Sequence, residues 1–214
     1  MTIRLAILAS GRGSNLQAIL DAIAAGTLDA RVVGVFSDRP DAQALQRVPE
    51  ALRWSRTPKS FANRAAFDAA LADAVAASAP DWVVCVGYMR ILGAAFVQRF
   101  HGRVLNIHPS LLPKYKGLHT HQRALEAGDA WHGASVHFVV PELDAGAVIA
   151  QARIAVEPTD DADALAARVL TVEHPLLLHV LGLATAGRLA ESAGHALVDG
   201  QRLYTPLPLP LNPT

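Results

Sequence analysis

The chain has 214 residues, of which 51% are hydrophobic and 18% charged, and its formal net charge at pH 7 is zero. This composition excludes an intrinsically disordered chain, because disordered chains are poor in apolar residues and rich in charge. The 19 basic residues are balanced by 19 acidic ones. We therefore expect neither a protein that binds nucleic acid through a basic excess nor one that lies on a membrane surface. A local phosphate site stays open, since it needs only a few donors.

Cysteine content and hydropathy indicate the cellular compartment in which the protein is expected. The single cysteine, Cys85, cannot form an intrachain disulfide and fits a reducing environment. The longest apolar stretch, residues 176–186, contains His179 and is too short to span a bilayer. Residues 5–9 lack the length and cleavage pattern of a secretory signal. We expect a cytoplasmic protein.

Short apolar strands alternate with amphipathic helices along the chain. Strands are expected over residues 3–8, 31–36, 82–86, 103–107, 134–140 and 148–156, and helices over residues 16–23, 61–77, 91–100, 118–127 and 159–183. A loop is expected over 109–117 and a hairpin near 195–203. This alternation predicts an α/β fold with a doubly wound, mostly parallel sheet. We expect one domain over residues 1–205 and a proline-rich tail over 206–214 that is extended or frayed.

A glycine-rich segment lies between the first expected strand and the first expected helix. It consists of Gly11, Arg12, Gly13, Ser14 and Asn15. Glycines let the backbone approach a phosphate closely, and a helix N-terminus adds partial positive charge, so the segment is a candidate anion site. A dinucleotide site is an alternative because Asp38 follows the second strand, although Leu16 stands where the dinucleotide motif has its third glycine. A purely structural turn is the third interpretation.

Asn106 and His108 lie two residues apart near the end of an expected buried strand. Residues two apart on a strand share a face, so both side chains are directed toward the carboxyl end of the sheet, where open α/β folds bind ligands. An amide N–H and an imidazole side by side can stabilise a developing oxyanion. The alternative is that the two side chains only cap the strand end.

Several histidines follow this strand and raise the question of a metal. They are His119, His121, His132 and His137. If residues 118–127 form a helix, His119 and His121 do not share a helix face. The sequence also has no His-Glu-x-x-His pattern and no cysteine cluster. We expect no metal site.

Residues 108–115, His-Pro-Ser-Leu-Leu-Pro-Lys-Tyr, resemble the folate-dependent formyltransferases. The likeness covers nearly the whole chain and extends to residues 10–15, 87–92, 106–115, 117–121, 135–138 and 142–146. The glycine-rich segment and the lack of sequence for further domains narrow it to the branch that acts on glycinamide ribonucleotide. The chain departs from the family at Ala134, where threonine is common, at Ala147, where proline is common, and at Lys116, where some members have proline. None of these departures removes a polar group expected to do chemistry.

The resemblance implies a single-domain, Rossmann-like formyltransferase fold and a specific reaction. A formyl group would pass from 10-formyltetrahydrofolate to the amine of glycinamide ribonucleotide in de novo purine biosynthesis, by direct amine attack and without a metal. Asn106 and His108 would stabilise the oxyanion, and His108 would give a proton to the leaving nitrogen. Asp144 would favour the charged form of His108, a contact that rests on the resemblance alone. The protein would be a monomer or homodimer.

The resemblance also assigns substrate-binding residues. Residues 11–15 would hold the ribonucleotide phosphate, and Glu173 would accept hydrogen bonds from ribose hydroxyls, its alternative being an exposed helix acid. The folate would be held by Arg64, Met89, Arg90, Ile91, Leu92 and Val140, with the two arginines on its carboxylates. Arg64 has the alternative of a solvated helix residue. The Leu112–Pro113 peptide bond is expected to be cis.

Three other functions are weighed against this one. Formyltetrahydrofolate deformylases carry an additional N-terminal domain, for which we expect no room because the first strand begins at Ile3. Methionyl-tRNA formyltransferases add a C-terminal nucleic-acid-binding domain, which we do not expect in a chain that ends at residue 214 without a basic excess. A non-catalytic phosphate-binding module would use only the glycine-rich segment.

Overall fold

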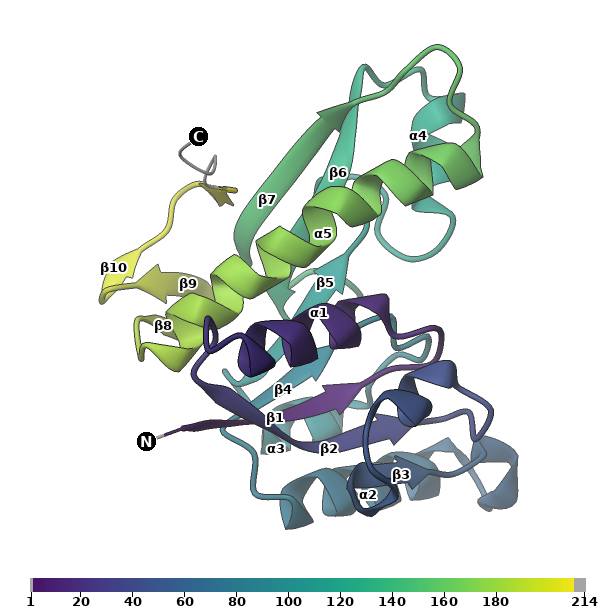
Figure 1. Cartoon of the computed structure of the whole chain (residues 1–214), viewed down its shortest axis with the longest axis vertical. Coiled ribbons are helices and arrows are strands. Elements are labelled where there is room, and N and C mark those ends of the chain that lie inside the picture. Colours follow the sequence, from purple (N-terminus) through teal and green to yellow (C-terminus); the bar gives the residue numbers. More distant parts are fainter. Residues whose placement is uncertain (1, 210–214) are drawn as a thin grey trace. The chain divides into compact units, whose positions relative to one another are not determined.

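The structure is a computed structural model that describes residues 2–209. Its contacts divide the chain into two compact units, residues 1–106 and 107–214. Strand β5 (Val104–His108) begins in the first unit and ends in the second. Figure 1 shows that each unit combines strands with helices, the first coloured purple to teal and the second teal to yellow.

The first unit is built on a parallel sheet. Its strands are hydrogen-bonded in the order β5-β4-β1-β2-β3, with every pair parallel. Besides β5 they are β1 (Ile3–Leu8), β2 (Ala30–Ser37), β3 (Arg53–Ser55) and β4 (Trp82–Cys85). The helices are α1 (Ser14–Ala24), α2 (Arg64–Ala77) and α3 (Ala94–Arg99), and the 3-10 turns are η1 (Gln43–Arg47), η2 (Glu50–Leu52) and η3 (Pro58–Ser60). In Figure 1, α1 passes in front of these strands and α3 lies behind them.

Burial explains the apolar pattern of this unit. The side chains of residues 5–8 in β1 are fully buried, as expected for a parallel strand covered on both faces. Leu16 and Ile19 give α1 a fully buried stripe at helical spacing. Helix α2 begins after Asn63, whose side chain accepts a hydrogen bond from the backbone N–H of Ala66 at 2.9 Å.

The second unit has a mixed sheet and a small antiparallel one. The strands of the mixed sheet have the order β11-β7-β6-β5, in which β6 and β7 are antiparallel and β7 and β11 are parallel. The strands of the small antiparallel sheet have the order β10-β9-β8. The elements are α4 (Thr120–Glu126), β6 (Trp131–Phe138), β7 (Val148–Ala155), α5 (Ala162–Thr185), β8 (Leu189–Ser192), β9 (His195–Val198), β10 (Gln201–Arg202) and β11 (Leu207–Pro208). Helix α5 packs against β6 and β7 and crosses in front of them in Figure 1.

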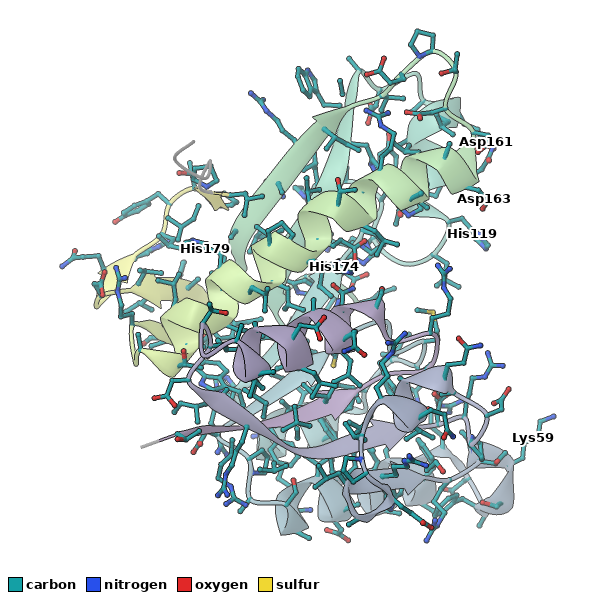
Figure 2. The ribbon with its side chains drawn as sticks, viewed as in Figure 1. Lys59, His119, Asp161, Asp163, His174 and His179 are labelled. Carbon is teal, nitrogen blue, oxygen red and sulfur yellow. The ribbon has the colours of Figure 1, made fainter. Side chains whose placement is uncertain are left out.

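Helix α5 is long and apolar enough to cross a membrane by length and composition, a test that the core helix of a soluble protein also passes. Its apolar side chains Leu165, Val169 and Leu176 are fully buried. Asp161 caps the helix by accepting a hydrogen bond from the backbone N–H of Ala164 at 2.8 Å. Figure 2 shows this acidic start of the helix at the label of Asp161, and acidic side chains there suit the positive end of the helix dipole.

The predicted α/β architecture with a mostly parallel sheet is confirmed, but several boundaries differ. The helix expected over 91–100 begins only at Ala94, after Gly93, and the expected helix over 118–127 begins at Thr120. The sequence pattern misses the three-residue β3, the 3-10 turns and β8. In the expected tail, Leu207 and Pro208 pair with Ala150 and Gln151 of β7, while residues 210–214 lie outside the described part of the chain.

Candidate active site

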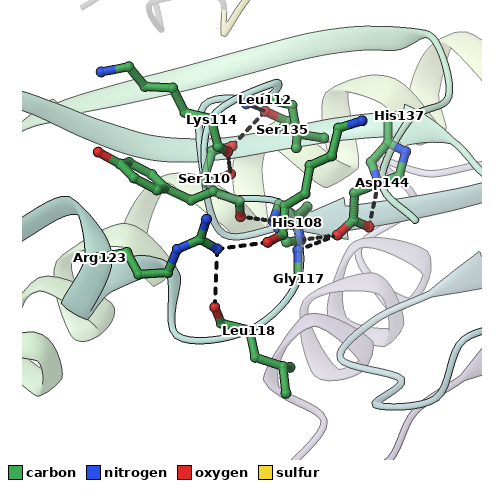
Figure 3. A network of polar contacts seen from close by, with 12 residues as sticks. His108, Ser110, Leu112, Lys114, Gly117, Leu118, Arg123, Ser135, His137 and Asp144 are labelled. Atoms are coloured by element: carbon green, nitrogen blue, oxygen red, sulfur yellow. Dashed lines mark hydrogen bonds and ion pairs between the residues drawn. The ribbon is translucent and has the colours of Figure 1, made fainter. Parts of the chain in front are cut away.

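The carboxylate of Asp144 lies between two buried histidine rings in the second unit. Its Oδ2 atom is 3.5 Å from Nδ1 of His108, and its Oδ1 atom is 3.6 Å from Nε2 of His137 (Figure 3). The backbone N–H of Gly117 donates to Asp144 Oδ2 at 2.8 Å. The side chains of His108, His137 and Asp144 are 7%, 2% and 10% exposed. The structure therefore brings Asp144 to His108, a contact that the sequence spacing could not establish.

The other nitrogen of the His108 ring is engaged by the backbone. His108 Nε2 lies 2.9 Å from the carbonyl oxygen of Tyr115. Because a carbonyl oxygen can only accept, Nε2 carries a hydrogen and donates it. Nδ1 is then the nitrogen that faces Asp144, at a distance longer than an ordinary hydrogen bond. Nδ1 is thus less tightly committed than Nε2 and is the ring atom better suited to a further partner.

Asn106 and His108 both lie on β5. They are two residues apart on this strand and so project from the same face of it, as predicted. Asn106 is half-buried and His108 is buried. An amide and an imidazole on one strand face could supply two hydrogen-bond donors for one developing negative charge.

His137 is the component of this cluster that sequence reasoning did not assign to the site. Its Nδ1 atom is 2.8 Å from the carbonyl oxygen of Phe138. Burial lowers the pKa of His137 to about 4, so the ring is neutral near pH 7. Ser135 and His137 lie two residues apart on β6, a spacing that predicts a shared strand face, although the pairing of β6 with β7 shifts register between Val136 and His137. Ser135 in turn donates a hydrogen bond of 2.6 Å to the carbonyl oxygen of Ser110, which lies two residues after His108.

The loop after β5 is held by further hydrogen bonds. Ser135 Oγ accepts a hydrogen bond from the backbone N–H of Leu112 at 3.0 Å, and Gln151 donates to the carbonyl oxygen of Leu112 at 2.8 Å. The Leu112–Pro113 peptide bond is cis, as predicted. These contacts fix the backbone that leads from His108 to Tyr115.

The glycine-rich segment has the geometry of an anion site in the first unit. Gly13 precedes helix α1 with φ +74°, and no side chain caps the helix start. Gly11 and Arg12 are exposed, Ser14 is half-buried, and Asn15 is buried in the first turn of the helix. A left-handed glycine followed by an uncapped helix N-terminus presents backbone N–H groups to an anion.

In the sequence, Asp38 favours a dinucleotide site and Leu16 opposes one. The structure gives both residues other roles. Asp38 is buried and accepts a hydrogen bond of 2.5 Å from the hydroxyl of Ser10. That hydroxyl also accepts the backbone N–H of Met89 at 2.9 Å. Leu16 is fully buried in the core of the first unit. Asp38 therefore orders the protein backbone here, and Leu16 fills a position that the dinucleotide motif reserves for glycine.

Gly13→Ala is expected to lower the free energy of unfolding by about 2–4 kcal/mol, from left-handed strain and overpacking. A Cβ atom at Gly13 would lie 2.8 Å from the Cα atom of Ala44, whereas a Cβ at Gly11 would meet nothing within 4 Å. Gly11→Ala is the matched control and should change stability by about 0.5 kcal/mol or less. Urea unfolding of both variants measures this, and equal effects would contradict the steric argument.

A cavity of about 260 Å³ in the first unit is lined by Arg64, Met89, Arg90 and Ile91. These are four of the six predicted folate-binding residues. The other two are elsewhere: Leu92 is buried, and Val140 is a half-buried residue of the second unit. The cavity thus joins two guanidinium groups to two exposed apolar side chains, Met89 and Ile91.

The two arginines of this cavity differ in how they are held. Arg64 Nη2 donates to the carbonyl oxygen of Ile91 at 2.7 Å, so Arg64 contacts the cavity backbone as well as solvent. The guanidinium of Arg90 lies 5.3 Å from the ring centroid of Phe67. Its buried Nε atom finds no hydrogen-bond acceptor within the described residues. A buried donor without an acceptor fits a site that receives a carboxylate.

Glu173 lies on α5 with 7% of its surface exposed. The interpretation of Glu173 as an exposed helix acid is therefore wrong. The assignment of Glu173 to the ribonucleotide stays a prediction.

The histidines considered as metal ligands form a pair rather than a cluster. His132 Nε2 lies 3.1 Å from His121 Nδ1, so one ring donates and the other accepts. His119 precedes α4 with φ +58° and is exposed; Figure 2 shows it on the loop beside that helix. Within residues 2–209 no three His, Cys, Asp or Glu side chains are grouped so that they could hold a metal ion.

The stability contributed by His132 is expected to fall in acid. Burial lowers the pKa of His132 from 6.5 to about 4, so the unfolded chain binds a proton more readily than the folded one. The stabilisation is complete above about pH 6.5 and is lost as the pH falls toward 4. The difference in free energy of unfolding between wild type and His132→Gln should shrink over that range. Urea titrations between pH 7.5 and 4 measure it, and a constant difference would contradict the prediction.

Comparisons with known proteins agree with one another. The formyl transferase family matches residues 3–181. The phosphoribosylglycinamide formyltransferase of Escherichia coli K12 is 49% identical over 199 residues, which cover 92% of this chain and 94% of that protein. The human trifunctional purine biosynthetic protein adenosine-3 is 38% identical over 186 residues, 86% of this chain and 18% of that protein. The solved phosphoribosylglycinamide formyltransferase of Coxiella burnetii has a TM-score of 0.92 at 41% identity, covering 98% of this chain and 100% of its own.

Proposed function

Because the chain belongs to the formyl transferase family, we propose that it transfers a formyl group from 10-formyltetrahydrofolate to the amine of glycinamide ribonucleotide in de novo purine biosynthesis. The observation that carries the proposal is the likeness to the Escherichia coli enzyme over nearly the full length of both chains. The proposed role is a cytoplasmic one with two small-molecule substrates and without nucleic acid, membrane or metal, carried out by a monomer or homodimer.

The nucleophile in this reaction is the substrate amine. An α-amino group has a pKa of about 7.7–8.0, so a useful fraction is unprotonated near neutral pH. The protein then needs no nucleophilic side chain of its own. Cys85 is unsuited to that role, because burial raises the pKa of its thiol to about 12.

The residues of β5 would act on the tetrahedral intermediate. 10-Formyltetrahydrofolate supplies an electrophilic one-carbon unit, whose oxygen gains negative charge when the amine adds to it. Asn106 would donate a hydrogen bond from its amide, and His108 would donate from its ring. The buried carboxylate of Asp144, 3.5 Å from His108 Nδ1, supports a positive charge on that ring by Coulomb attraction.

His108 would also move a proton. The attacking nitrogen loses a proton and the leaving nitrogen gains one, so a side chain that can both accept and give up a proton lowers the barrier. The Nε2–H of His108 is engaged by the carbonyl oxygen of Tyr115. We therefore assign the proton transfer to Nδ1, the nitrogen on the side of Asp144.

Two other groups of residues would bind the ends of the substrates. Residues 11–15 would hold the ribonucleotide phosphate through backbone N–H groups at the start of α1, and Glu173 would accept hydrogen bonds from ribose hydroxyls. Arg64 and Arg90 would pair with folate carboxylates, and Val140 with residues 89–92 would contact the pterin. The unpartnered Nε atom of Arg90 supports this assignment.

The experiment is a formyl-transfer assay on purified protein with 10-formyltetrahydrofolate. Consumption of the folate should require glycinamide ribonucleotide and yield the formylated ribonucleotide in equal amount. Release of formate without the ribonucleotide would instead indicate hydrolysis. Tight phosphate binding without turnover would indicate a non-catalytic binding module, and either result would overturn the proposed function.

A further inference from the structure

We propose that Asp129 is a positioning residue for His108. Its carboxylate holds residues 114 and 115 so that the carbonyl oxygen of Tyr115 accepts the Nε2–H of His108. The expected effect on kcat rests on the proposed function. The hydrogen bonds that link Asp129, Tyr115 and His108 can be tested separately on the unliganded protein.

The carbonyl oxygen of Tyr115 is the hydrogen-bond partner that restrains the Nε2 side of the His108 ring. It lies 2.9 Å from Nε2. This acceptor fixes which ring nitrogen carries the hydrogen and how the ring is turned. A small rotation of the Tyr115 peptide would therefore alter both the orientation of the ring and the nitrogen presented to Asp144.

The backbone of Tyr115 does not adopt this conformation by local preference. Its φ is +56°, in the left-handed region that a bulky side chain such as tyrosine rarely occupies. Such a conformation persists when surrounding contacts hold it, and it is often found where function depends on it. The contacts that hold Tyr115 are thus the ones to identify.

Asp129 supplies the most direct of these contacts. Its Oδ2 atom accepts a hydrogen bond of 2.8 Å from the hydroxyl of Tyr115. Lys114 Nζ donates to Oδ1 at 2.8 Å and to Oδ2 at 2.9 Å. One carboxylate therefore accepts hydrogen bonds from two consecutive side chains of the loop. The Asp129 side chain is only 17% exposed although Lys114 is 60% exposed.

The hydrogen bonds of Asp129 connect two parts of the second unit that lie on either side of α4 in the sequence. Residue 115 belongs to the loop before the helix, and Asp129 follows the helix, where its backbone N–H donates to the carbonyl oxygen of Ala124 at 3.1 Å. Arg123, on α4, places its guanidinium 5.1 Å from the Tyr115 ring centroid and donates to the carbonyl oxygen of Lys116 at 2.7 Å. Figure 3 shows the Arg123 side chain reaching this loop, with one dashed line to Leu118. The helix thus acts as the support against which the loop is held.

The charge of Asp129 is maintained by the same contacts. Hydrogen bonds from Lys114 and Tyr115 hold the pKa of the Asp129 carboxyl below its ordinary value. The carboxylate is therefore ionised throughout the neutral range in which the reaction would run.

The test compares Asp129→Asn and Tyr115→Phe with Asp199→Asn. Asp199 is a matched control, because it accepts two hydrogen bonds from Arg188 at 2.8 and 2.6 Å on the surface of the same unit. We expect the first two variants to lower kcat about tenfold while KM for either substrate stays within about twofold, which is the pattern for a loosened catalytic group. Asp199→Asn should leave kcat unchanged. Asp129→Glu should recover part of the lost kcat.

A second measurement separates this inference from the proposed function. In the ¹⁵N NMR spectrum of the histidine rings, the Nε2 signal of His108 should shift in Asp129→Asn and Tyr115→Phe and stay in place in Asp199→Asn. Tyr115→Phe removes only the hydroxyl and keeps the ring on Arg123, so it remains informative if Asp129→Asn does not fold. An unchanged His108 signal together with unchanged kcat would overturn the inference. Absence of formyl transfer by the wild type would overturn the proposed function, and the NMR comparison would still decide the role of Asp129.

Discussion

Replacing His108 by alanine is expected to lower kcat for formyl transfer by about 10²- to 10³-fold, the usual effect of removing one oxyanion donor from a buried site. The ring lies on β5 with its side chain 7% exposed and a carboxylate on one side. In the proposed mechanism this ring would both stabilise charge and transfer a proton, so its loss would remove two contributions at once. Asn106→Ala should cause a loss of the same order, because the amide is the second donor on the strand face.

The control for His108→Ala is a histidine outside the site. His101 is exposed in the turn after α3, and His101→Ala should leave kcat within about twofold of wild type. Steady-state kinetics with both substrates, together with urea unfolding, distinguishes a catalytic loss from unfolding. If His108→Ala folds and turns over at nearly the wild-type rate, neither the oxyanion nor the proton-transfer role can be correct.

The fold was predictable wherever its pattern is local. The strand at residues 3–8 and the stripe of α1 are visible because a buried parallel strand is continuously apolar and a covered helix repeats every three or four residues. Strand β3 has only three residues, Arg53–Ser55, and no recognisable period. Its existence depends on pairing with residues 35–37 of β2, which sequence spacing does not specify.

The residues of the candidate site also divide into those that a local sequence pattern indicates and those that only long-range contacts bring together. Asn106 and His108 are indicated by strand alternation, and the glycine-rich segment by its position before a helix. Asp144 could be assigned to the site only from the family resemblance, because 35 residues, including α4 and β6, lie between it and His108. No tyrosine pattern predicts φ +56° at Tyr115. Contacts across long stretches of chain, and backbone conformations that they impose, are set by tertiary packing and are invisible in a local pattern.

Asp144→Asn is expected to lower kcat by about 10²- to 10³-fold, because it removes a buried carboxylate that would stabilise positive charge on His108 in the transition state, a loss of about 3–4 kcal/mol. The variant is nearly isosteric. Its side-chain oxygen can still accept the Gly117 N–H that Asp144 accepts at 2.8 Å. What it removes is the negative charge 3.5 Å from His108 Nδ1.

Which kinetic constants change in Asp144→Asn is more informative than the size of the loss in kcat. If the carboxylate acts by favouring positive charge on His108 during the reaction, kcat and kcat/KM should fall together, with KM for the ribonucleotide little changed. Asp73→Asn, which removes an exposed carboxylate paired with Arg99 at 2.6 Å, is the control and should leave kcat as it is. A loss confined to KM would mean that Asp144 binds substrate without assisting the ring.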